Sequence, residues 1–92
     1  MKVFSIALEA MFNDEDEVRL IEEKYHLSIA NVTKFYVDLY ETSNPGKEYL
    51  GPAVYLFVGS IVDLYEYFKH GYGVNDDEEF RSIMSEVKVC EI

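Results

Sequence analysis

The chain has 92 residues, and its eighteen acidic residues outnumber eight basic ones to give a formal net charge of −10. This length fits one domain, residues 1–92, and the negative charge repels phosphate backbones and anionic membrane surfaces, so direct nucleic-acid binding and membrane attachment are not expected. Hydrophobic residues make up 49% of the chain, which is enough for a packed core and argues against intrinsic disorder.

The N-terminal part of the chain predicts a strand followed by a helix. Apolar residues alternate with others over residues 2–11, which is the period of a strand with one buried face. Asn13 or Asp14 can cap a helix start, and the acids after them suit the positive end of the helix dipole. We expect an amphipathic helix of about three turns there, with an apolar stripe formed by Val18, Ile21 and Tyr25.

The middle of the chain predicts two more strands joined by a turn. Residues 32–42 alternate again, with Tyr36 and Tyr40 on one face. Pro45 and Gly46 fit the centre of a type II turn. Residues 53–58 are nearly all apolar, which predicts a strand in the centre of the sheet.

The C-terminal part predicts two helices and a short strand. Ser60 and Asp63 form a capping-box pattern, which predicts a helix over residues 61–70 that ends at a left-handed Gly71. Residues 75–78 repeat the helix-start pattern, with Asn75 at its head, and the chain ends on a strand over residues 87–92. The expected buried stripes are Ile61, Leu64, Tyr65 and Phe68 in the first helix and Phe80, Ile83, Met84 and Val87 in the second.

The expected architecture is an α+β fold with elements in the order β-α-β-β-α-α-β. Its small, mostly antiparallel sheet has the helices packed on one face. An exposed edge strand near residues 2–11 or 87–92 could pair across a two-fold axis, so the sequence is compatible with a homodimer.

Residues that catalyse reactions or hold cofactors do not occur in a recognisable pattern. One cysteine and two histidines cannot build the usual zinc site, and no glycine-rich phosphate loop is present, so we expect no enzyme, no metal and no cofactor. His26 and His70 lie near predicted helix ends, where a protonated imidazole suits the dipole. Cys90 is expected to be a buried or half-buried small side chain, and a single cysteine favours the reducing cytoplasm.

Carboxylates are the most distinctive feature of the chain, and they gather in two runs. The first acidic run is Asp14, Glu15, Asp16, Glu17, Glu22 and Glu23, and the second acidic run is Asp76, Asp77, Glu78 and Glu79. One interpretation is that these acids are helix caps and a solvated helix face. The other is that they imitate the regular negative charges of duplex DNA and bind the basic groove of a DNA-binding protein.

Three tyrosines are candidate interface anchors, because a tyrosine combines a large apolar ring with a polar tip. They are Tyr36, Tyr40 and Tyr72. For Tyr36 and Tyr40 an alternative stays open, in which they cover the second face of the sheet beneath a helix.

Residues 60–92 resemble the C-terminal half of a small type II-A anti-CRISPR inhibitor family. The resemblance rests on Ser60-Ile61-Val62-Asp63, on Phe68-Lys69, on Gly71-Tyr72, and on Asp77-Glu78-Glu79 followed by Phe80 and a closing strand. In that family, acids near this position occupy the DNA-reading surface of an RNA-guided nuclease, so the resemblance implies this role for the second acidic run. In size and charge the chain also resembles the Arn-type anti-restriction proteins of phages, which are DNA mimics directed at the nuclease McrBC.

These features lead to one expected function and one alternative. The expected function is a phage-encoded DNA mimic that inhibits a host restriction or CRISPR nuclease in the host cytoplasm, using the carboxylates of the two acidic runs. The alternative is an acidic adaptor or regulatory subunit that binds another protein through an aromatic patch. The first predicts binding that salt weakens and duplex DNA displaces, and the second predicts binding that survives both.

Overall fold

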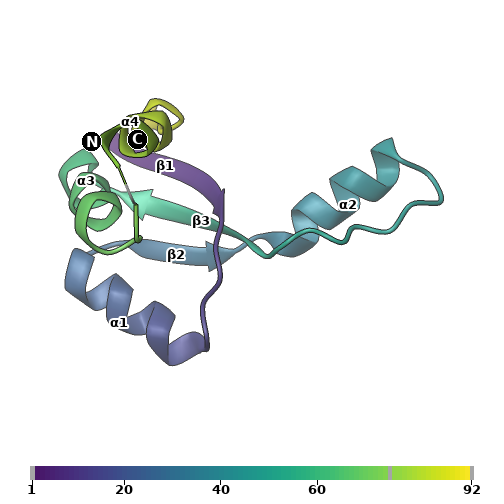
Figure 1. The fold of residues 1–92 in the computed structure, drawn as a ribbon, viewed down its shortest axis with the longest axis horizontal. Helices are drawn as coiled ribbons and strands as arrows, with labels where there is room; N and C mark the ends of the chain where they lie inside the picture. The colour runs from purple at the N-terminus through teal and green to yellow at the C-terminus, as the bar shows by residue number, and fades with distance from the viewer. Residues whose placement is uncertain (1, 75, 92) are drawn as a thin grey trace.

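The computed structural model of the protein describes residues 2–74 and 76–91, which form four strands and four helices (Figure 1). Asn75 and Ile92, which belong to the predicted second helix start and to the predicted last strand, lie outside the described residues. In chain order the elements are β1 (Lys2–Glu9), α1 (Glu15–Tyr25), β2 (Ser28–Asn31), α2 (Thr33–Ser43), β3 (Val54–Gly59), α3 (Ile61–His70), α4 (Asp77–Ser85) and β4 (Lys88–Glu91).

The sheet confirms the predicted α+β fold class. Its strands lie in the order β2-β3-β1-β4, and each neighbouring pair is antiparallel. β3 lies in the interior of the sheet, as the apolar residues 53–58 predict. Of the two expected edge strands, the one near residues 87–92 is confirmed and the one near residues 2–11 is wrong, because β4 pairs with the outer side of β1 and leaves β2 and β4 at the two edges.

The predicted strand over residues 32–42 is also wrong, since this segment forms helix α2 and only the shorter β2 precedes it. The apolar residues of this segment fit a four-residue repeat as well as an alternating one. In a helix, the four-residue repeat places Tyr36 and Tyr40 on the same side. On its surface, Lys34 Nζ and Asp38 Oδ2 lie 2.9 Å apart, again four residues along the chain. The element order therefore contains one more helix than predicted, between β2 and β3.

One hydrophobic core fills the space between the sheet and the helices α1, α3 and α4. Its buried residues are Ile6, Leu27, Phe57, Leu64, Tyr67, Phe68 and Phe80. The predicted stripe of α3 is only partly right: Leu64 and Phe68 are fully buried, whereas Ile61 and Tyr65 are 39% and 44% exposed. Tyr67 is buried in their place, because the helix is turned so that this ring contacts a tyrosine of α1.

Two glycines are required for different physical reasons. Gly46 has a φ of +80° in a turn closed by a 3.1 Å backbone hydrogen bond from Lys47, which confirms the predicted type II turn. The predicted left-handed conformation of Gly71 is wrong, because its φ is −116°. A β-carbon on Gly71 would lie 2.9 Å from both the Tyr25 hydroxyl oxygen and Cδ1 of Tyr67, so the lack of a side chain is what this position requires.

Helix α2 and the loop after it project beyond the end of the sheet, away from the other three helices (Figure 1). The expected packing of helices on one face thus holds for α1, α3 and α4. On the opposite face, Ala7 and Leu56 line an open hollow that Tyr36 of α2 borders. Within residues 2–74 and 76–91, each helix is too short or too polar to cross a lipid bilayer.

Candidate functional site: two acidic runs that meet at one pocket

Both acidic runs begin helices, and each places an aspartate at the N-cap position. Asp14 Oδ1 accepts the backbone N–H of Glu17 at 2.9 Å, and Asp76 Oδ1 accepts the backbone N–H of Glu79 at 2.7 Å. Glu17 also contacts the segment before this helix, because its Oε2 accepts the backbone N–H of Asn13, the residue before the N-cap, at 2.6 Å. For the two aspartates, this geometry supports the interpretation as helix caps.

The outer face of α1 holds further acids of the first run, and one of them has a structural role. Glu22 Oε2 accepts the backbone N–H of Ile29 at 3.0 Å and so ties α1 to the outer side of the edge strand β2. Arg19 lies 3.6 Å from two other acids, Glu15 and Asp16. All three side chains are exposed, so these ion pairs contribute little to stability.

Part of the second acidic run also forms contacts within the protein. Lys69 Nζ donates to Asp77 Oδ1 at 2.9 Å, and this hydrogen bond holds the pKa of Asp77 below its usual value. The same contact raises the pKa of Lys69. Glu23 of the first run and Glu78 of the second are exposed and form no ion pair or side-chain hydrogen bond within the described part of the chain, so they remain available to a partner.

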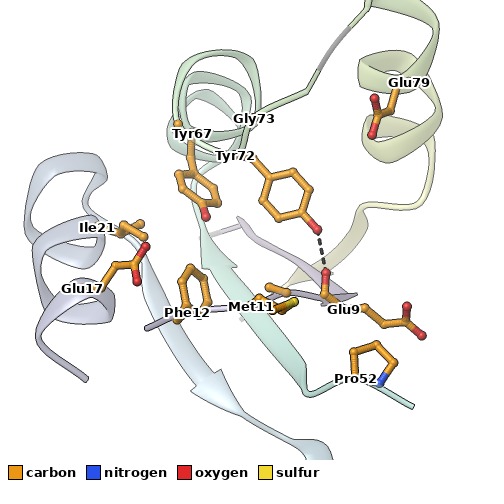
Figure 2. A pocket seen from close by; sticks show the side chains of 12 residues that line it. Glu9, Met11, Phe12, Glu17, Ile21, Pro52, Tyr67, Tyr72, Gly73 and Glu79 are labelled. Atoms are coloured by element: carbon orange, nitrogen blue, oxygen red, sulfur yellow. Dashed lines mark hydrogen bonds between the residues drawn. The ribbon is translucent and has the colours of Figure 1, made fainter. Parts of the chain in front are cut away.

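The pocket shown in Figure 2 brings the two runs together. It has a volume of about 490 Å³ and lies among α1, α3, α4 and the segment that follows β1. Glu17 of the first run and Glu79 of the second both line it, and its described lining contains no lysine, arginine or histidine. The lining residues are Glu9, Ala10, Met11, Phe12, Glu17, Ile21, Pro52, Tyr67, Gly71, Tyr72, Gly73 and Glu79.

Two tyrosines form the wall between these carboxylates. The Tyr72 hydroxyl donates to the backbone carbonyl of Glu9 at 2.7 Å (Figure 2). Burial, followed by the charges of Glu79 and Glu9, raises the pKa of Tyr72. Burial is also the main cause that raises the pKa of Tyr67, with smaller effects from Tyr72 and Glu17. Both hydroxyls stay protonated near neutral pH, so the charge of the pocket comes from its carboxylates.

Sequence reasoning proposed Tyr72 as an interface anchor but missed the other aromatic walls, Phe12 and Tyr67. The structure makes Tyr72 a half-buried pocket wall. Phe12 follows the end of β1 in a short irregular segment, where no period indicates the direction of a side chain. Tyr67 lies three residues after the buried Leu64, and this spacing is the signal that could have identified it.

The other two predicted interface tyrosines lie on α2 and do not line the pocket of Figure 2. Tyr36 and Tyr40 are 36% and 37% exposed. Their neighbours Phe35 and Leu39, which the sequence did not single out as interface residues, are more exposed still, at 61% and 50%. Tyr36 also borders the hollow on the open sheet face, so it partly takes the sheet-covering role that was the alternative.

The histidines and the cysteine lie away from the pocket. His26 adopts the left-handed conformation that ends α1, and His70 Nε2 lies 3.6 Å from Glu66 Oε2 at the end of α3. The expected burial of Cys90 is wrong, because β4 is an edge strand and this side chain is exposed. Within the described residues, no three histidine, cysteine or acidic side chains are arranged to hold a metal ion.

No family model, curated protein or solved structure significantly matches this chain.

Proposed function

We propose that this protein is a phage-encoded DNA mimic, which inhibits a host restriction or CRISPR nuclease by occupying its basic DNA-binding cleft. One observation carries the proposal. The two acidic runs, which are far apart in the sequence, both reach the pocket of Figure 2, and no basic side chain among the described residues lines that pocket. A surface of this kind presents negative charge from two helices to a single partner.

The mechanism is electrostatic and stoichiometric. A DNA-binding cleft carries lysines and arginines that normally neutralise phosphates, and the net charge of −10 attracts such a cleft at long range. At short range, the acids without structural partners replace phosphates. Glu23 and Glu78 are the best candidates, since neither is needed to hold a helix end or a strand. No cofactor takes part, and the site of action is the host cytoplasm.

The proposal is tested with purified nucleases free of DNA, one of the modification-dependent restriction class and one type II-A CRISPR nuclease. The double variant Glu23→Lys/Glu78→Lys raises the net charge from −10 to −6, because each reversal adds two charges. The matched control is Glu41→Lys/Glu48→Lys, which produces the same net charge at exposed positions on the projecting α2 and its loop.

The expected result is that the wild-type chain binds one of these nucleases, that duplex DNA displaces it, and that salt weakens the complex. The Glu23→Lys/Glu78→Lys variant should bind at least about tenfold more weakly than the control, since close charge pairs across an interface couple strongly. Failure of both nucleases to bind, or equal weakening by the two double variants, would contradict the proposal.

A second candidate is an adaptor or regulatory subunit that binds a protein through α2. It is favoured by the exposure of Phe35 and Leu39 on a helix that projects from the domain, since exposed apolar groups of this kind mark interaction surfaces. In that case Leu39→Ser should abolish the complex, and neither high salt nor duplex DNA should disturb it. Binding that Leu39→Ser leaves unchanged excludes this candidate.

A further inference from the structure

The pocket of Figure 2 contains a polar group that the chain itself does not satisfy. Tyr67 is only 1% exposed, yet its hydroxyl makes no hydrogen bond within the described residues. Every fully enclosed side-chain oxygen or nitrogen of the described part does have a partner. The Tyr67 oxygen therefore lies at the surface of the pocket, into which Figure 2 shows it pointing. Side-chain polar groups of buried residues are nearly always hydrogen-bonded, so this hydroxyl is available to accept a hydrogen bond from a group that enters the pocket.

The groups around this hydroxyl have the chemistry of a cation site. Glu17 lies on the α1 side of the pocket, and its hydrogen bond from the backbone N–H of Asn13 uses one carboxylate oxygen, Oε2, so that Oε1 is left for a ligand. The ring of Phe12 lies beside it and supplies an aromatic surface (Figure 2). Glu79 and Tyr72 close the opposite side. Negative charge and aromatic surfaces together favour an organic cation over a bare ion.

A guanidinium group fits this combination better than an ammonium group. It is planar and can stack on an aromatic ring, and its fork of N–H groups can donate to a carboxylate and a hydroxyl at the same time. A volume of about 490 Å³ leaves room for a whole arginine side chain. Within the described residues, no three acidic, histidine or cysteine side chains are arranged to hold a metal ion, which argues against metal as the ligand.

We propose that this pocket binds the guanidinium group of an arginine side chain from the partner protein, with the carboxylate of Glu17 and the hydroxyl of Tyr67 as acceptors and Phe12 as the stacking surface. That the arginine belongs to a DNA-binding cleft rests on the proposed function. Binding of a guanidinium cation by the pocket does not, and it is tested separately.

The test is a titration of the full chain with ethylguanidinium chloride at constant ionic strength, followed by the NMR signals of the tyrosine rings. Uncharged ethylurea and the non-planar cation propylammonium are the comparison ligands. The signals of Tyr67 and Tyr72 should shift saturably with ethylguanidinium, and much less with the two comparison ligands. Equal responses to ethylguanidinium and to either comparison ligand would overturn the proposal.

Three variants locate the site. Glu17→Gln keeps a side-chain oxygen that can accept the backbone N–H of Asn13 but removes the charge, and it should weaken ethylguanidinium binding about tenfold. Tyr67→Phe removes only the hydroxyl and should weaken binding severalfold. Glu41→Gln makes the same charge change at an exposed position of α2 outside the pocket lining and should leave binding unchanged. If Glu17→Gln and Glu41→Gln behave alike, the cation does not bind in the pocket, and this holds even if Tyr67→Phe fails to fold.

The two proposals can fail independently. If the chain binds ethylguanidinium but neither nuclease, the pocket site stands and the DNA-mimic function does not. If a nuclease binds and duplex DNA displaces it, but Glu17→Gln binds that nuclease as tightly as the wild type, the function stands and the arginine pocket is wrong.

Discussion

Two adjacent glutamates of α1 should differ in how much stability the same substitution removes. Glu22 Oε2 accepts the backbone N–H of Ile29 at 3.0 Å in a partly buried position, whereas Glu23 is exposed. Both Glu22→Ala and Glu23→Ala remove one negative charge and introduce the same good helix former, so effects on charge repulsion and helix propensity cancel between them. The difference in their stability therefore measures the bond between α1 and β2.

The magnitude follows from that bond. A hydrogen bond to a charged acceptor contributes about 1.5–3 kcal/mol to stability. Because the Glu22 side chain is only partly buried, its bond should contribute an amount near the lower end of this range, and we expect Glu22→Ala to cost about 2 kcal/mol. Glu23→Ala should change the free energy of unfolding by less than about 0.5 kcal/mol. With a urea m-value of about 1–2 kcal/mol/M, the unfolding midpoint of Glu22→Ala should fall by about 1–2 M.

The assay is urea unfolding followed by circular dichroism, with the m-values of the two variants compared to confirm that the unfolded states are alike. Equal midpoints for Glu22→Ala and Glu23→Ala would refute the reasoning. They would mean that water satisfies the N–H of Ile29 equally well and that Glu22 is free to face a partner, as the sequence alone suggested.

Three other predictions concern the core, the pocket wall and acid sensitivity. Leu64→Ala changes a fully buried position and should lower the free energy of unfolding in urea by about 3–5 kcal/mol. Val62→Ala, at a position of the same helix that is 64% exposed, should lower it by well under 1 kcal/mol, and similar losses for the two variants would contradict the assigned core. Gly71→Ala should destabilise the domain by about 1–2 kcal/mol through crowding of two tyrosine rings, and a stabilised variant would show that the close approach is wrong. Because the Lys69 hydrogen bond lowers the pKa of Asp77, the stabilisation from this pair is present above the ordinary carboxyl pKa and is lost as the pH falls through the pKa of folded Asp77. In Lys69→Ala an NMR titration should find the pKa of Asp77 closer to its ordinary value, and an unchanged pKa would exclude Lys69 as the cause.

Several features of this protein could be read from the sequence because they depend on local chemistry. Helix starts were expected at Asn13 or Asp14 and within residues 75–78, because such side chains bond the free N–H groups of the next turn, and the structure places the N-caps at Asp14 and Asp76. The bounds of α3, the turn at Gly46 and the central position of β3 were predicted for similar reasons. The α+β class follows from how these elements alternate along the chain.

The predictions that proved wrong concern segments whose local sequence pattern fits two different structures. Residues 32–42 fit both a two-residue and a four-residue apolar repeat, and the choice of a helix depends on the strand β2 ending at Asn31. There, the Asn31 side chain accepts the backbone N–H of Thr33 at 3.0 Å. The exposure of Cys90 likewise depends on which strand lies at the edge of the sheet, and that is settled only when β4 pairs with β1.

The candidate site depends partly on local sequence and partly on tertiary packing. The sequence by itself determined the charge of the chain and placed its acids in two runs, because both follow from composition and from helix-capping chemistry. Only the tertiary structure decided that Glu17 and Glu79, which are 62 positions apart in the sequence, line one pocket with Tyr67 between them. The physical reason is that α1 and α4 both pack beside α3 on the same sheet face, and this packing depends on contacts between distant residues that no local pattern records.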